Sequence, residues 1–243
     1  MAGTAKIQQF TAAQIAREQQ GGVLILDTRA AEVFASAHIR GALQLGLMGP
    51  FASWAAILIA PKQKLLIVAQ DEASAQEAQV RLARVGLEHI TGFTLADEKE
   101  WRRHEIGTAT LPICECKEAW RNQQQGRTPQ IIDVRSPAEW LTGHLPGAIS
   151  VPLPKLNAEV ASIDFTKPSL VYCREGYRAT TAASVLLRRN VRDVGIVIDG
   201  MEWINRPQAC SMAPYTPSDV SKRAPWYLSE ANNQKTSGRQ QTR

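Results

Sequence analysis

Short, mostly apolar runs alternate along the chain with longer stretches in which apolar residues recur every three or four positions. Residues 23–26 and 131–134 are runs of the first kind, which is typical of strands buried on both faces of a sheet. Residues 75–85 and 179–187 belong to the second kind, and their spacing predicts helices. Strands that alternate with helices predict an α/β fold in which parallel sheets are flanked by helices.

The pattern also repeats. An Asp-x-Arg motif begins at Asp27 and again at Asp133, and His38 and His144 follow eleven residues after each aspartate. A Gly-Ala pair comes three residues after each histidine. Identical spacings predict a duplicated domain, with a boundary near residues 107–112, where Gly and Pro interrupt the pattern.

The expected organisation is a first domain at 1–109, a second at 110–217 and a tail at 218–243. The tail is basic and rich in polar residues, which predicts disorder. Most of the net charge of +5 lies there, so the charge describes a solvated tail and no nucleic-acid partner is expected.

No apolar run reaches the roughly 18 residues that span a bilayer, and the first residues lack the apolar region of a signal peptide. We therefore expect a cytoplasmic protein with no membrane partner, in which thiols are reactive or buried rather than cross-linked. Of the four cysteines, Cys114 and Cys116 could bind a metal or relay sulfur, although two ligands do not make a zinc site. No role is expected for Cys210.

The remaining cysteine, Cys173, lies where a predicted strand meets an amphipathic helix. Ligands of parallel sheets bind at this end of the strands, and the helix N-terminus and loop N–H groups attract anions. Arg174 and Arg178 favour the thiolate, Glu175 opposes it, and Gly176 permits the tight turn. The alternative is that Cys173 is a small apolar residue at the end of a strand.

Asp-x-Arg, His-x-x-Gly-Ala and Cys-x-x-Gly-x-Arg at a strand-to-helix turn together resemble the rhodanese domain, over residues 7–205. In that family the cysteine accepts a sulfane sulfur, becomes a persulfide and passes the sulfur to a nucleophile. The resemblance implies that Cys173 is the catalytic nucleophile and that no metal or organic cofactor is needed. It also implies a substrate-binding loop made of Arg174, Glu175, Gly176, Tyr177 and Arg178.

The resemblance implies a small sulfur donor, such as thiosulfate or a persulfide, and a thiol, cyanide or protein acceptor. Two other functions stay open. One is a non-catalytic sulfur carrier or protein-interaction module of the same fold. The other is a phosphatase or arsenate reductase, which the loop length disfavours because related phosphatases use Cys-x5-Arg and this chain has Cys-x4-Arg.

The first copy lacks this chemistry. A gapless alignment of the two helices places Ala69 opposite Cys173 and Ser74 opposite Arg178. Asp71 and Glu72 lie in the same loop, where two carboxylates repel anions. We therefore expect an inactive first domain, similar to the rhodanese pairs attached to metallo-β-lactamase-fold persulfide dioxygenases. The Asp, Arg and His of both copies are expected to be structural, because they persist where the cysteine is absent.

Overall fold

The structure is a computed structural model, and it describes residues 6–116, 119, 129–145, 147–159, 163–164, 166–191 and 193–198. The predicted tail at 218–243 and Cys210 lie outside these residues.

The first half of the chain forms a parallel sheet with the strand order β3-β1-β4-β5. A short antiparallel pair, β2 with β6, lies beside it. In chain order the elements are α1 (Ala12–Gln20), β1 (Leu24–Asp27), α2 (Ala31–Ser36), β2 (His38–Ile39), β3 (Leu43–Gln44), α3 (Phe51–Leu58), β4 (Leu65–Ala69), α4 (Glu72–Ala83), β5 (Ile90–Leu95), α5 (Glu98–Arg103) and β6 (Thr108–Ala109).

The second half forms a parallel sheet with the strand order β7-β11-β10-β8-β9. In chain order the elements are β7 (Ile113–Cys114), β8 (Gln130–Asp133), α7 (Pro137–Leu141), β9 (Ile149–Ser150), the 3-10 helix η1 (Leu153–Lys155), α8 (Leu156–Glu159), β10 (Ser169–Tyr172), α9 (Tyr177–Arg188) and β11 (Val194–Val197).

The predicted fold class, an α/β protein with parallel sheets flanked by helices, is confirmed. Every residue of β1, β4, β10 and β11 is buried, as expected of strands covered on both faces. The helix predicted from the apolar stripe at 75–85 begins earlier, at Glu72, because Asp71 caps it by accepting a hydrogen bond from the Ser74 N–H at 2.7 Å.

The two sheets correspond strand by strand around their centres. Asp27 lies opposite Val68 in the β1–β4 pair, and Asp133 lies opposite Tyr172 in the β8–β10 pair. Ala69 follows Val68, just as Cys173 follows Tyr172. The register of the strands therefore places residue 69 where the second half has its cysteine.

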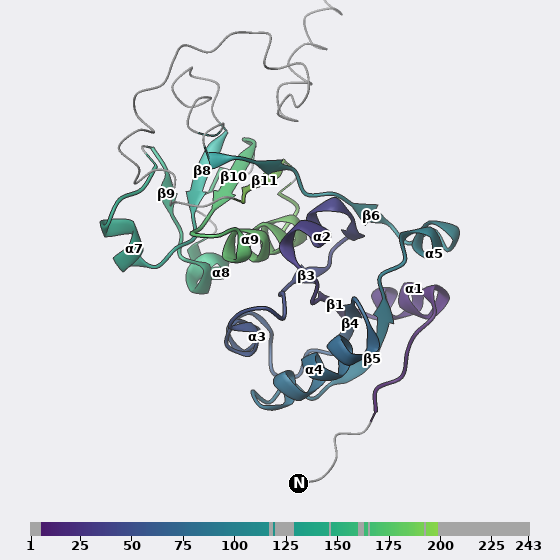
Figure 1. The fold of residues 1–243 in the computed structure, drawn as a ribbon. Coiled ribbons are helices and arrows are strands. Elements are labelled where there is room, and N and C mark those ends of the chain that lie inside the picture. The colour runs from purple at the N-terminus through teal and green to yellow at the C-terminus, as the bar shows by residue number, and fades with distance from the viewer. Residues whose placement is uncertain are drawn as a thin grey trace, which may run out of the picture.

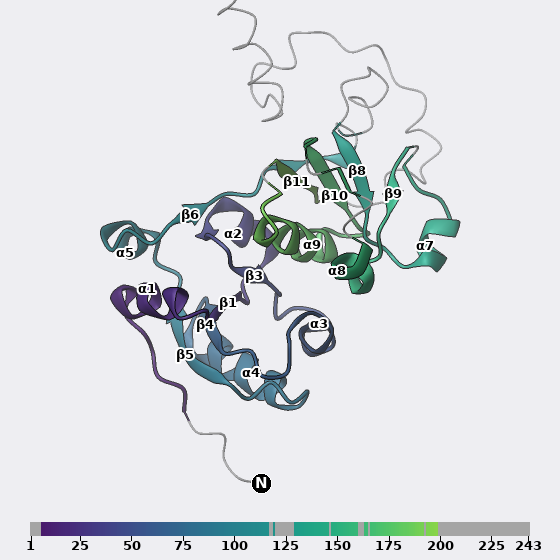
Figure 2. The same ribbon diagram turned by 180° about the vertical axis from the view of Figure 1, so that it is seen from behind.

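Helix α9 lies between its own sheet and the first half of the chain, where it packs against β3 and α2 (Figures 1 and 2). Ser184 Oγ accepts a hydrogen bond from the Gln44 N–H at 3.0 Å, and the Thr181 hydroxyl donates one to Gln44 Oε1 at 3.2 Å. Arg188 adds a 2.7 Å hydrogen bond to the carbonyl oxygen of Gly41. The helix that follows the cysteine is thus held by both halves, and buried apolar residues of both halves form one continuous cluster.

Among the described residues, the structure contains no helix with the length and apolar character that crossing a bilayer requires.

Candidate active site

The cysteine of interest lies at the carboxyl end of a central strand. Cys173 follows β10 directly and is 1% exposed, whereas the next two residues, Arg174 and Glu175, are exposed. Gly176 then caps α9 with a φ of +81°, a conformation that favours glycine. A Cβ atom on Gly176 would lie 3.1 Å from Ile198, so both backbone conformation and space require glycine in this turn.

Arg178 forms a two-pronged ion pair that the sequence reasoning missed. Its two terminal nitrogens donate to the two carboxylate oxygens of Glu139, each at 2.7 Å. The hydrogen bonds from Arg178 are the main reason that the pKa of Glu139 falls to about 2. We expected Arg178 to be a cation of the substrate-binding loop that favours the thiolate, and the structure also gives it a carboxylate partner.

Glu139 is held in turn by the start of its own helix. The Ser136 N–H and hydroxyl donate to Glu139 Oε2 at 3.0 and 2.9 Å, and the Glu139 N–H donates to Ser136 Oγ at 3.2 Å. This is a capping box, and Pro137 supplies the fixed φ suited to the first turn. The Ser-x-x-Glu spacing was a readable signal for the cap, although not for the ion pair.

The loop is less cationic than the sequence suggested. Arg174 approaches Glu175 at 3.5 Å, and both side chains are largely exposed, so this pair contributes little stability. Arg178 is paired with Glu139. Each arginine of the loop is therefore matched by a carboxylate, and the backbone N–H groups and the start of α9 add positive potential for an anion.

The second half of the chain is similar to a known protein family. Residues 115–206 match the rhodanese-like domain family. The match includes the strand, the cysteine loop and the helix just described, and it does not extend over the first half.

Curated relatives are similar over the same kind of segment. The chain is 33% identical over 88 residues to "HTH-type transcriptional regulator Rv0324" of Mycobacterium tuberculosis, which covers 35% of this chain and 38% of that protein. It is 35% identical over 68 residues to "Uncharacterized protein YqhL" of Bacillus subtilis, which covers 28% of this chain and 54% of that protein. The chain thus spans about half or less of the length of these relatives.

Solved structures give a distant likeness over more of the chain. Thiosulfate sulfurtransferase from Pseudomonas aeruginosa is 22% identical with a TM-score of 0.36, over 80% of this chain and 41% of that one. SseA from Escherichia coli, described as a 3-mercaptopyruvate sulfotransferase, is 20% identical with a TM-score of 0.34, over 79% of this chain and 97% of that one.

Tyr177, which we predicted to lie in the substrate-binding loop, reaches the first half. Its hydroxyl donates to the carbonyl oxygen of Gly46 at 2.9 Å. A Cβ on Gly49 would lie 3.2 Å from the Tyr177 ring, so the ring packs closely on that backbone. Burial raises the pKa of Tyr177 to about 12, and the hydroxyl therefore stays protonated and can keep this bond at ordinary pH.

Asp133 and Arg135 form a buried pair with structural contacts. Arg135 donates to Asp133 Oδ2 at 2.6 Å and to the carbonyl oxygen of Gly143 at 2.7 Å. In the first half, Arg29 makes the same two bonds, to Asp27 at 2.6 Å and to the residue before the histidine at 2.8 Å. Contacts kept in both halves agree with the expected structural role.

The histidines of the two halves are also alike. His144 stacks on Trp140 with ring centroids 3.5 Å apart, and His38 stacks on Phe34 at 3.9 Å. Each Nδ1 lies within hydrogen-bond distance of the carbonyl oxygen of the same aromatic residue. Burial is the main cause of the lowered pKa of His38, so that ring favours the neutral form.

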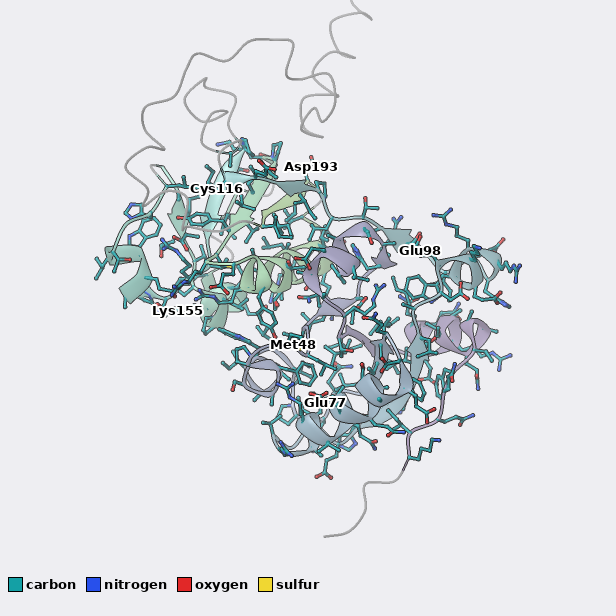
Figure 3. The ribbon with its side chains drawn as sticks, in the orientation of Figure 1. Met48, Glu77, Glu98, Cys116, Lys155 and Asp193 are labelled. Carbon is teal, nitrogen blue, oxygen red and sulfur yellow. The ribbon has the colours of Figure 1, made fainter. Side chains whose placement is uncertain are left out.

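In the first half, the place that corresponds to the Cys173 loop is a cavity of about 490 Å³. The described residues that line it include no cysteine. Ser74 and Glu77 line it from the first half, and Glu175 and Tyr177 line it from the second. Figure 3 labels Glu77 and another lining residue, Met48. Glu32 lines this space as well, and the lining arginine, Arg29, is paired with Asp27, which makes the cavity a poor site for an anion.

Cys114 and Cys116 are buried on the face of the second sheet that carries Tyr172 and Val197. Cys173 packs into the cluster on the opposite face, beside α9. Figure 3 labels Cys116, which lies away from the first half. The sheet therefore separates these two thiols from Cys173, which weakens the interpretation of a sulfur relay. No group of three or more His, Cys, Asp or Glu side chains within the described ranges could hold a metal ion.

Proposed function

We propose that this protein is a rhodanese-type sulfurtransferase in which Cys173 carries sulfane sulfur as a persulfide. The observation that supports it most is the position of Cys173 at the end of β10, one short loop before α9, inside the segment that matches the rhodanese-like domain. That family supplies the reaction class, and the identity of the donor and acceptor is part of our proposal.

The reaction proceeds in two displacement steps. The Cys173 thiolate attacks the sulfane sulfur of a donor such as thiosulfate or a persulfide, and a new sulfur–sulfur bond forms. The bond between that sulfur and the donor breaks, and its electron pair leaves with sulfite or a thiolate. A thiol, cyanide or protein nucleophile then takes the terminal sulfur, and Cys173 leaves as the thiolate. No oxidant or cofactor enters the balance.

The loop serves this chemistry through its backbone. The twelve-residue helix α9 directs its N-terminal N–H groups towards the loop, and its dipole favours a negative charge there. Gly176 lets the chain turn tightly enough to bring these groups near Cys173. We propose Arg174, Glu175, Gly176, Tyr177 and Arg178 as the loop that surrounds the transferred sulfur, with Tyr177 anchoring it to the first half.

We propose that the two halves are a tandem repeat of rhodanese-like domains, at 1–109 and 110–217, and that the first is inactive. The support is the matching strand register and the shared Asp–Arg pair, together with Ala69 in place of a cysteine. On this interpretation the chain is similar to the rhodanese pairs of persulfide dioxygenases, and it acts in the cytoplasm.

A second candidate is a non-catalytic sulfur-binding or protein-interaction module of rhodanese fold. The low exposure of Cys173, together with a carboxylate for each loop arginine, favours it. The two candidates differ in one measurable property, the uptake of sulfur by the Cys173 thiol.

The deciding experiment is mass spectrometry of the full chain after incubation with thiosulfate or glutathione persulfide, followed by cyanide. We expect the mass of one added sulfur on the peptide with Cys173, and thiocyanate after cyanide. Cys173→Ser should abolish both, whereas Cys116→Ala, which removes another buried thiol, should abolish neither. Sulfur uptake by Cys173→Ser at the wild-type rate, or no uptake by the wild type with either donor, would overturn the proposal.

A further inference from the structure

The Glu139–Arg178 ion pair joins two separate elements of the second half. Glu139 lies on α7 and Arg178 lies in the first turn of α9, and the residues are 39 positions apart in the chain. Only 21% of the Arg178 side chain and 30% of the Glu139 side chain are exposed. A two-pronged pair of this kind fixes the plane of the guanidinium as well as its position.

The carboxylate has little freedom to move. It accepts two hydrogen bonds from Arg178 and two from Ser136, one through the Ser136 N–H and one through its hydroxyl. Because the pKa of Glu139 is about 2, the carboxylate stays charged at every pH at which the protein would work. The capping box thus holds Glu139, and Glu139 holds the guanidinium.

Arg178 and Cys173 lie at the two ends of the same short loop, with Cys173 directly after β10 and Arg178 in the first turn of α9. The pKa of Arg178 is raised mainly by its hydrogen bonds to Glu139, and the Cys173 sulfur adds to that rise. Because the loop between them is short, the guanidinium and the thiol are held near each other, which agrees with the direction of this shift. A series of residues therefore runs from Ser136 through Glu139 to Arg178 by hydrogen bonds, and from Arg178 to Cys173 along the short loop.

The first half provides an internal control for this series. Buried alanines and a leucine recur at matching places in α4 and α9, so the gapless alignment of these helices extends back to the loops. At the positions of Ser136, Glu139, Arg178 and Cys173, the first half has Ala30, Val33, Ser74 and Ala69.

All four members of the series are therefore absent together, although the Asp–Arg pair and the stacked histidine are kept. The helix that begins after Ala30 even forms without a side-chain cap. A fold that dispenses with the series in one half does not need it as a strut.

We infer that Glu139 is a positioning residue for the chemistry at Cys173, which holds the Arg178 guanidinium beside the reacting sulfur. This inference rests on the proposed sulfurtransferase function, because that function gives Cys173 its reaction. Its structural basis is the ion pair between Glu139 and Arg178. Glu139 is hydrogen-bonded to Ser136 and Arg178, and it acts on the sulfur through Arg178.

Glu139 could either position the Arg178 guanidinium or simply neutralise its charge. These two roles predict opposite effects of a Glu139 substitution on the reactivity of the Cys173 thiol. If Glu139 only neutralises Arg178, then Glu139→Gln removes a negative charge near Cys173 and makes the thiol more reactive. If Glu139 positions the arginine, the same substitution lets the guanidinium swing towards solvent and makes the thiol less reactive. Glu139→Asp keeps the charge and shortens the side chain, so only the positioning role predicts a loss for it.

The test is the rate at which iodoacetamide alkylates Cys173 in the full chain, followed by peptide mass spectrometry between pH 5 and 9. We expect Glu139→Gln and Glu139→Asp to slow alkylation at neutral pH by roughly tenfold, the change that about 1.4 kcal/mol produces. The alkylation profile should shift to higher pH. Arg178→Ala should behave alike, and adding Glu139→Gln to Arg178→Ala should slow alkylation no further, because the two residues act as one unit.

Glu98→Gln is the matched control. It removes one carboxylate from an exposed ion pair with Arg102, and Figure 3 shows Glu98 on the far side of the molecule from Cys116. Its alkylation rate should equal that of the wild type. Faster alkylation of Glu139→Gln, or an unchanged profile with a lower melting temperature, would overturn the positioning role. Alkylation needs no sulfur donor, so its outcome is separate from that of the sulfur-uptake experiment.

Discussion

The hydroxyl of Tyr177 donates a 2.9 Å hydrogen bond to the carbonyl oxygen of Gly46, which lies 131 positions earlier in the chain. Tyr177 is the first residue of α9, so this bond attaches the helix start beside the proposed active site to the first half of the protein. The geometry of the cysteine loop therefore depends on residues far from it in sequence.

Tyr177→Phe should lower the free energy of unfolding by about 1 kcal/mol, because it removes one buried hydrogen bond and leaves a carbonyl oxygen without that partner. Denaturant unfolding measures the change. Sulfur uptake by Cys173 should slow by no more than a few-fold. A loss of uptake as large as that of Cys173→Ser would give the hydroxyl a direct part in the chemistry and contradict its anchoring role.

Gly176→Ala should destabilise the protein by about 1–3 kcal/mol, because φ is +81° and the new Cβ would meet Ile198 at 3.1 Å. Gly86→Ala is a matched control, since φ is +78° there and a Cβ would meet nothing within 4 Å. Thermal melts of both variants separate the cost of close contact from that of the backbone conformation. Equal losses in the two variants would mean that Ile198 moves aside freely.

Arg178→Ala should slow sulfur loading by about ten- to a hundredfold. The substitution removes the proposed charge-assisted hydrogen bond, of about 1.5–3 kcal/mol, from the guanidinium to the negative charge that develops on the sulfur. It should also lower stability at neutral pH, since the Glu139 carboxylate loses its partner. Single-turnover loading and thermal melts measure the two effects. Normal loading with a large drop in melting temperature would identify Arg178 as a structural strut instead.

The stability difference between wild type and Arg178→Ala should depend on pH in a definite direction. The pKa of Glu139 is lowered from 4.5 to about 2 in the folded protein, so its charged form stabilises the fold. That stabilisation is complete above about pH 5 and is lost as the pH falls through 4.5 towards 2. Melts at several pH values should converge at the acidic end, and a difference that is constant down to pH 2 would contradict this assignment.

Ala69→Cys in a Cys173→Ser background should not acquire a persulfide. Ala69 is fully buried. The loop that follows it has the carboxylates Asp71 and Glu72, where the binding of an anion would need hydrogen-bond donors. Mass spectrometry after incubation with glutathione persulfide measures the result. Sulfur on residue 69 would show that a thiol at the end of the strand is sufficient, without the ion pair of the second half.

Local patterns in the sequence were enough to predict several central strands and the helices α4 and α9. Apolar runs identified β1 and β10, and the three-to-four spacing identified α9, because these signals depend on neighbouring residues alone. The need for a glycine at position 176 was also predictable, since a tight strand-to-helix turn commonly uses a positive φ.

Contacts between distant residues were not predictable in the same way. The sequence spacing of Ser136 and Glu139 indicates a helix cap, but nothing local indicates that the same carboxylate also binds Arg178. Tyr177 was similarly assigned to the substrate loop, because its contact with Gly46 depends on how the two halves pack. Both contacts depend on tertiary packing, which the spacing of residues along a single sequence does not reveal.

The burial of α9 has a consequence for how the protein unfolds. Residues 179–186 are buried without exception, although a helix on the surface of an isolated domain would expose one face. Pulling the halves apart would expose that face and leave Gln44 without its partners on Thr181 and Ser184. The two halves should therefore melt in one cooperative transition, and the second half cut out alone should be an aggregation-prone fragment.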